Sequence, residues 1–199
     1  MALLTEACRA AAEAVRAYRL MPNHVHLILV PSGVDGLRAA LSEGHRRYSR
    51  RINFRAGWRG YLRQGRFAST PMYEDHLIVA ARYVELNPLR ARLAARPEAC
   101  RWWSGRAHLA GRDDGVVQVQ PLLERAPDSA AFLGEGLDDE AHAAMQSAER
   151  TGRPLGGADC RRRPRAVVGP CARAPEAQAQ APRCGGGSGE IPVWSAPLA

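Results

Sequence analysis

The chain has 199 residues, enough for one domain with a tail or for two small domains. It is 46% hydrophobic, 24% charged and only 6% aromatic, and no stretch approaches the roughly 18 apolar residues of a membrane-spanning helix. The N-terminus lacks the basic and then apolar pattern of a secretion signal. Its five cysteines are scattered without a Cys-x-x-Cys pair, which argues against a disulfide framework or a structural zinc site. We therefore expect a cytoplasmic location.

The charge is distributed unevenly along the chain. All 28 basic residues are arginine, and the formal net charge is +8. Residues 1–110 hold 18 arginines and 8 acidic residues, residues 111–160 hold 4 and 10, and residues 161–199 hold 6 and 2. A GC-rich codon usage explains arginine in place of lysine, but not the shortage of acids in the first half. A basic segment of this size indicates a polyanionic partner such as nucleic acid.

Local patterns predict most elements in the first 94 residues. In chain order they are a helix over 5–16, strands over 18–20 and 24–30, a helix over 37–52, a strand over 67–72, a helix over 74–86 and a helical turn over 89–94. The strand over 24–30 is rich in β-formers and ends at Pro31. Asn87-Pro88 should interrupt the helix before it, because the residue before proline is disfavoured in helical geometry.

The second half has weaker patterns. Short helices are predicted around 121–124 and 138–150, and after Gly152 the chain is mostly Gly, Pro, Ala and Arg, with too few large apolar residues for a core. The predicted organisation is a domain over 1–115, a weakly helical acidic extension over 116–156 and a disordered basic tail over 157–199.

His24 and His26 form the first candidate site. Residues two apart in a strand project from the same face, so both imidazoles can converge on one ion or phosphate. Taken alone, a His-x-His pair is a weak signal, and packing or surface roles are the alternative.

The helix over 74–86 carries the second candidate site. Leu77, Ala81 and Val84 share its apolar face, which should belong to the core. A different stripe holds Tyr83 and Asn87, which are neighbours one turn apart. The alternative is a half-buried tyrosine followed by an asparagine that closes the helix.

The third feature is a run of arginines and aromatics between residues 46 and 66 that contains no acid. It consists of Arg46, Arg47, Arg50, Arg51, Arg55, Arg59, Arg63 and Arg66, interleaved with Tyr48, Phe54, Trp58 and Tyr61. Arginine neutralises phosphates and aromatics stack on unpaired bases, so the run is a candidate nucleic-acid surface. A solvated basic face is the alternative. His45, His108 and His142 are isolated and are interpreted as ordinary residues, and Trp102-Trp103 as a packing anchor.

Three segments together resemble the REP-associated tyrosine transposases, which belong to the HUH class of single-tyrosine DNA transposases. They are AYRLMPNHVHLILVP (17–31), LRQGRFAS (62–69) and RYVELNPLRARL (82–93). The similarity covers roughly 17–110 and is weaker in WWSGRAHLAGRDDG (102–115) and ERTGRPLG (149–156). MPNHVHL and YVELNP in this order, about 60 residues apart, are far more specific than either motif alone.

The resemblance implies a role for each matched residue. His24 and His26 would be ligands of Mg²⁺ or Mn²⁺, with Asn87 completing the metal site, and Tyr83 would be the nucleophile. The protein would nick and rejoin single-stranded or hairpin DNA through a 5′-phosphotyrosine link, as a monomer or homodimer. Arg90, on the stripe of Tyr83, is a further candidate for contact with DNA or with the phenolate.

The resemblance also implies an α+β fold, with a ferredoxin-like antiparallel sheet and helices on one face. Family members usually have a first strand and helix before the segment that matches 17–31, whereas only 16 residues precede it here. The missing strand would lie in the middle of the sheet, and its absence would leave unpaired backbone beside the strand of His24 and His26. Two other functions remain open: a truncated, catalytically inactive protein that binds DNA hairpins, and a His-x-His metal phosphoesterase for small phosphate esters.

Overall fold

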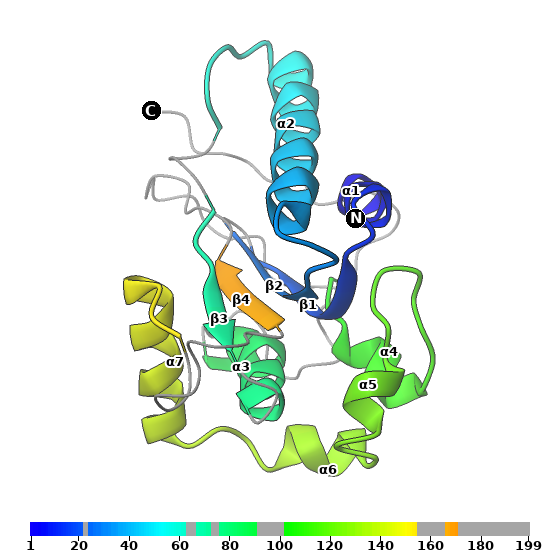
Figure 1. Ribbon diagram of the computed structural model, residues 1–199, viewed down its shortest axis with the longest axis vertical. Coiled ribbons are helices and arrows are strands. Elements are labelled where there is room, and N and C mark those ends of the chain that lie inside the picture. Colours follow the sequence, from blue (N-terminus) through cyan, green and yellow to red (C-terminus); the bar gives the residue numbers. More distant parts are fainter. Residues whose placement is uncertain (22–23, 63–66, 73–75, 91–101, 155–165, 171–199) are drawn as a thin grey trace.

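A computed structural model describes the parts of the chain that carry the candidate site. These parts are residues 1–21, 24–62, 67–72, 76–90, 102–154 and 166–170, with 87–90 and 166–170 described by backbone alone. The strands are β1 (Ala14–Leu20), β2 (Val25–Val30), β3 (Thr70–Met72) and β4 (Ala166–Pro170). The helices are α1 (Ala2–Ala10), α2 (Gly36–Ala56), α3 (Leu77–Arg90), α4 (Gly105–Ala110), α5 (Gln120–Leu123), α6 (Ser129–Gly134) and α7 (Asp139–Thr151). The fold is α+β, as the sequence predicts (Figure 1).

The strands form one antiparallel sheet in the order β1-β2-β4-β3. β1 and β2 are consecutive and pair with Arg19 opposite His26. β4 comes from the far end of the chain and lies between β2 and β3, with Pro170 opposite His26 and Val168 opposite Thr70. The strand that carries His26 therefore has a hydrogen-bonded neighbour on both sides.

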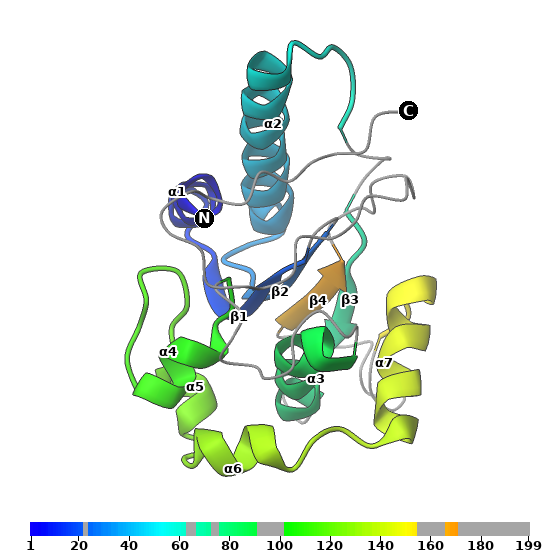
Figure 2. The ribbon, with the colours of Figure 1, turned by 180° about the vertical axis from the view of Figure 1, so that it is seen from behind.

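Both faces of the sheet are covered, which corrects the expectation of helices on one face only. Leu27 and Leu29 pack with buried residues of α1 and α2, whereas Ile28 packs with residues of α3. Because side chains alternate along a strand, an apolar run such as Leu27–Leu29 exposes hydrophobic surface on both faces, and each face needs its own cover. α1 and α2 lie on one side of the sheet, and α3 lies on the other (Figures 1 and 2).

β4 is the largest departure from the sequence-based prediction. We expected no structure in 157–199 and unpaired backbone beside β2, but Ala166–Pro170 pairs with both β2 and β3. The backbone groups of β2 and β3 provide hydrogen-bond partners that a five-residue segment cannot provide for itself. The remainder of the predicted tail lies outside the described residues, as does Pro22-Asn23 of the predicted turn.

Several helix boundaries also differ. α2 continues to Ala56 where the prediction ends at residue 52, and α3 begins at Leu77 where the prediction begins at residue 74. α1 ends at Ala10 and β1 begins at Ala14, where the alanine-rich pattern predicts a helix as far as residue 16. Val15 and Ala17 are buried against the core in the strand, and this burial outweighs the helix preference of the alanines around them, which is worth less than about 1 kcal/mol per residue. At its C-terminal end, α3 continues through Pro88 to Arg90. The predicted core residues Leu77, Ala81 and Val84 are all buried.

Residues 116–154 pack on the same core as the first 115. Leu122, Phe132 and Met145 share one buried cluster with Tyr83 and Trp103. The boundary that we placed after residue 115 therefore does not separate two cores, and the burial of Trp103 agrees with its interpretation as a packing anchor. Within the described parts of the chain, no helix combines the length and the apolar run needed to cross a bilayer.

Candidate active site

His24 and His26 lie together at the start of β2, on the side of the sheet covered by α3. Their Nε2 atoms are 2.8 Å apart and their rings are nearly perpendicular, with centroids separated by 4.6 Å. His26 is 2% exposed and His24 is half-buried. The predicted convergence of the two imidazoles is thus present in the structure.

Tyr83 projects from α3 toward the same place. Its ring centroid is 6.0 Å from that of His26 at an interplanar angle of 88°. α3 brings it there because the neighbouring stripe of the helix is buried in the core, which fixes the rotation of the helix about its axis. Tyr83 is only 4% exposed. Residues 57 positions apart in the sequence therefore meet at one site.

Glu149 of α7 joins Tyr83 to His26, and our sequence analysis assigned it no role. The Tyr83 hydroxyl donates to Oε2 of Glu149 at 2.9 Å, and Oε1 of the same carboxylate lies 3.2 Å from Nδ1 of His26. Glu149 is largely buried, with 12% of its side chain exposed. A carboxylate placed between a histidine and a tyrosine orients both side chains through charge-assisted contacts.

α7 contributes a second side chain that we had interpreted as ordinary. The His142 ring lies 5.3 Å from that of Tyr83. His142, Met145 and Glu149 are spaced three and four residues apart, so they share one face of α7, and Met145 is buried in the core below it. Two signals in the sequence could have drawn attention to Glu149: this spacing, and its place as the first residue of the segment ERTGRPLG (149–156).

The two histidines fit a metal site as a pair of ligands. Two imidazole nitrogens bound at right angles to one ion, each about 2.1 Å away, are about 3.0 Å apart. The observed 2.8 Å is close to this value, and it equally suits a hydrogen bond between the two rings. Asn87, the expected third ligand, lies on α3 one turn after Tyr83, and its side chain is outside the described residues. Among the described residues, no group of three or more His, Cys, Asp or Glu side chains could hold a metal ion.

The arginine run lies on the opposite side of the sheet from this cluster. α2 carries residues 46–55 of the run, and it extends well past the sheet at its C-terminal end (Figure 1). A nucleic acid that touches both the run and Tyr83 must therefore pass around an edge of the sheet. Arg63 and Arg66 are outside the described residues, as is the side chain of Arg90.

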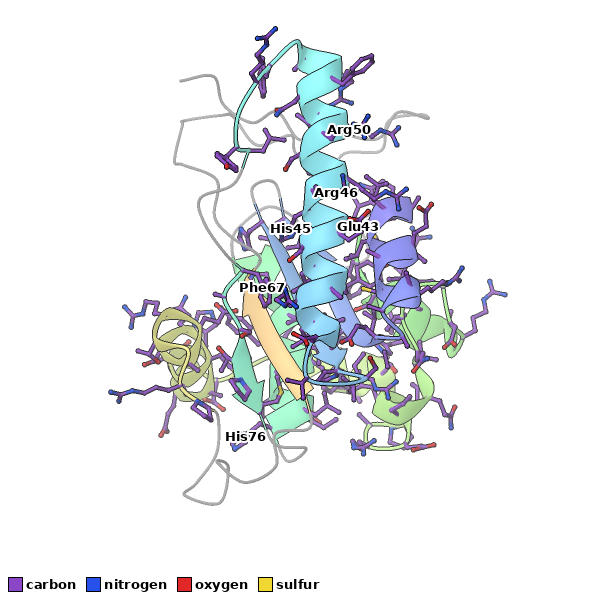
Figure 3. All side chains as sticks on the ribbon, turned by 45° about the horizontal axis from the view of Figure 1, so that its top comes forward. Glu43, His45, Arg46, Arg50, Phe67 and His76 are labelled. Atoms are coloured by element: carbon purple, nitrogen blue, oxygen red, sulfur yellow. The ribbon has the colours of Figure 1, made fainter. Side chains whose placement is uncertain are left out.

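Two arginines of the run are paired with acids, although the run itself contains none. Arg46 contacts Glu43 of the preceding turn at 2.8 Å, and Arg47 contacts Glu6 of α1 at 2.7 Å. The hydrogen bond from Arg46 lowers the pKa of Glu43 below its ordinary value. Arg50 lies nearer the far end of α2 than this pair (Figure 3). The positive charge at the start of the arginine run, at Arg46 and Arg47, is thus partly neutralised.

The outer part of the run keeps its charge and exposes aromatic rings. Arg50, Arg51 and Arg55 are exposed, as is Arg59 beyond the helix end. Phe54 is 91% exposed and Tyr61 is 100% exposed, while Trp58 is half-buried. Aromatic rings as exposed as Phe54 and Tyr61 are available for stacking, which supports the nucleic-acid interpretation of this surface.

A buried polar network anchors the helix that carries Tyr83. Glu85 and His108 are both buried, and Nδ1 of His108 lies 2.6 Å from Oε1 of Glu85. Ser104 donates to the same oxygen at 3.0 Å and accepts a hydrogen bond from the backbone N–H of Tyr18. His108 is therefore a structural partner of Glu85, which ties α3 to α4 and β1.

Comparison with known proteins identified no relative. No family model matches the chain, and neither a curated protein nor a solved structure is similar to it.

Proposed function

We propose that the protein is a metal-dependent enzyme that nicks and rejoins single-stranded or hairpin DNA, with Tyr83 as nucleophile. The proposal rests on the close approach of the His24, His26 and Tyr83 side chains. The resemblance to HUH transposases assigns the two histidines to the metal site and the tyrosine to the role of nucleophile. The segments that contain them are distant in the sequence, and the resemblance depends on the sequence alone. An HUH-type sheet is part of the same proposal, and the antiparallel order β1-β2-β4-β3 is compatible with it.

The reaction requires a good nucleophile held against a poor electrophile. Oη of Tyr83 would attack the phosphorus, forming a phosphotyrosine bond while the bond to the 3′-oxygen breaks. The phenolic proton leaves Tyr83, and the departing 3′-oxygen takes up a proton to become a hydroxyl. Because the phosphotyrosine bond conserves the energy of the phosphodiester, a 3′-hydroxyl can later reverse the step without ATP.

The two histidines would hold the metal ion, with Asn87 as a third ligand by resemblance. A divalent cation at this position would neutralise charge on the phosphate and orient it for attack. Nitrogen ligands favour Mn²⁺ over Mg²⁺.

The burial of Tyr83 favours one alternative, a protein that binds DNA hairpins without cleaving them. Glu149 and His142 of α7 cover the tyrosine, and at 4% exposure its hydroxyl cannot meet a phosphodiester in this arrangement. The enzyme therefore requires a local rearrangement that exposes the Tyr83 hydroxyl, whereas the binding protein requires only the exposed part of α2. No observation favours a phosphoesterase for small esters, which would leave the arginine surface without a role.

A cleavage assay decides between the enzyme and the binding protein. The full chain is incubated with a 3′-labelled DNA hairpin that carries a single-stranded flank, with Mn²⁺ or with a chelator, because the fragment on the 3′ side of the nick is the one that a 5′-phosphotyrosine link retains. The enzyme gives a DNA–protein adduct resistant to denaturation, in Mn²⁺ only, and His24→Ala and His26→Ala lose it. Hairpin binding without an adduct under every metal condition would establish the binding protein instead.

Neutralising Arg50 and Arg51 together is expected to weaken DNA binding and flatten its salt dependence. Each lost phosphate contact on a single strand should reduce the slope of log K against log salt by about 0.7. The matched control is the double replacement of Arg112 and Arg153 by glutamine, which removes the same charge from exposed positions elsewhere. Titrations over a salt series measure both. Equal slopes for the two double variants would show that α2 contributes only net charge.

A further inference from the structure

We infer that Glu149 is a positioning residue for both His26 and Tyr83. Its role toward Tyr83 rests on the proposed function, whereas its effect on the His26 tautomer does not. One carboxylate oxygen lies against Nδ1 of His26, and the other accepts the hydroxyl hydrogen of Tyr83. The carboxylate thereby sets which nitrogen of His26 carries its proton, and it holds the tyrosine hydroxyl beside the histidine pair.

The contact at Nδ1 decides what His26 can bind. The carboxylate lies 3.2 Å from Nδ1 at an ion-pair distance, without the alignment of a hydrogen bond, and its negative charge favours the tautomer with a proton on that nitrogen, which leaves Nε2 with a lone pair. Nε2 is the atom that faces Nε2 of His24 at 2.8 Å. Metal-binding histidines in proteins generally donate their second N–H to such a partner, which also raises the basicity of the ligand. Glu149 thus prepares His26 as a metal ligand from the side away from the ion.

The second contact acts on Tyr83. Donation of its hydroxyl to Oε2 at 2.9 Å restricts rotation of the hydroxyl group and links its position to that of the carboxylate. Any displacement of Glu149 is then felt at both Tyr83 and His26. The three side chains form one connected unit contributed by α7, α3 and β2.

The turn of α7 that precedes Glu149 is packed against the body of the protein. Ala148 and Met145 are buried, and Thr70 of β3 donates to the carbonyl of Ala148 at 3.2 Å. The helix begins at Asp138, whose carboxylate accepts from the backbone N–H of Ala141 at 2.7 Å. α7 is therefore held to the body of the protein in the turn that precedes Glu149, as positioning requires.

The experiment compares Glu149→Gln with Glu140→Gln in the full chain. Glu140 lies on the same helix but is exposed, so its replacement removes one charge outside the site. ¹⁵N NMR of the imidazoles, without metal, reports the tautomer of His26, and Mn²⁺ affinity is measured by electron paramagnetic resonance. We expect the Nδ1–H tautomer in the wild type and in Glu140→Gln, and a mixture of tautomers in Glu149→Gln. The Mn²⁺ affinity of Glu149→Gln should fall about 10- to 100-fold.

A third variant and an activity measurement separate this inference from the proposed function. Glu149→Asp keeps the charge but shortens the reach, so it should restore the tautomer only in part. Unchanged tautomer and unchanged Mn²⁺ affinity in Glu149→Gln, with the fold intact by circular dichroism, would overturn the inference even if the wild type cleaves DNA. A wild type that shows the expected tautomer dependence but forms no DNA adduct would overturn the proposed function alone.

Discussion

Replacing Tyr83 by phenylalanine is expected to abolish covalent attachment to DNA while leaving hairpin affinity nearly unchanged. The substitution removes only the oxygen that would attack the phosphorus and keeps the buried ring in the core. It also leaves one oxygen of Glu149 without the hydroxyl that it accepts, which should cost about 1–3 kcal/mol of stability. The adduct is measured by denaturing gel electrophoresis of labelled DNA, and affinity by titration with the same hairpin.

Tyr18→Phe is the matched control for this experiment. Tyr18 is also buried, and its hydroxyl donates to Asp114 at 2.5 Å, away from the candidate site. Its replacement removes an equivalent hydroxyl and should retain the adduct. If Tyr83→Phe formed the adduct as the wild type does, another residue would have to be the nucleophile.

The second large effect is expected for stability. Glu85→Ala should lower the free energy of unfolding by about 3–5 kcal/mol, because it leaves a buried histidine and a buried hydroxyl without their shared acceptor. Glu85→Gln keeps an acceptor at that position and should lose less. Glu85 also anchors α3, the helix that carries Tyr83. DNA cleavage by Glu85→Ala should therefore fall at temperatures where the variant begins to unfold.

Urea denaturation of the wild type, Glu85→Ala and Glu85→Gln measures these losses in the free energy of unfolding. Glu124→Ala is the control, since Glu124 is exposed and its removal should change stability by no more than about 0.5 kcal/mol. A loss below about 1 kcal/mol for Glu85→Ala would mean that His108 and Ser104 find other hydrogen-bond partners in the variant, as Ser104 can at the Tyr18 carbonyl.

The histidine pair and the tyrosine stripe could be predicted because each depends on local periodicity. Alternation along a strand places His24 and His26 on one face. Helical spacing places Tyr83 on a different stripe of α3 from the apolar residues Leu77, Ala81 and Val84. Glu149 could not be predicted in the same way. It lies 66 residues after Tyr83, in a helix whose sequence indicated only a weak acidic extension, and a single acidic residue on such a helix is ordinarily solvated.

By itself the sequence determined the positions of α2 and α7, the buried strand β2 and the candidate histidines at its start. These features follow from local propensity and from the period of the apolar pattern, which act within a few residues. Only the tertiary structure decided that α3 continues through Pro88, that Ala166–Pro170 fills the sheet between β2 and β3, and that α7 lies over Tyr83. Each of these depends on the burial of surfaces and the pairing of backbone groups between segments far apart in the chain, and no local pattern records those contacts.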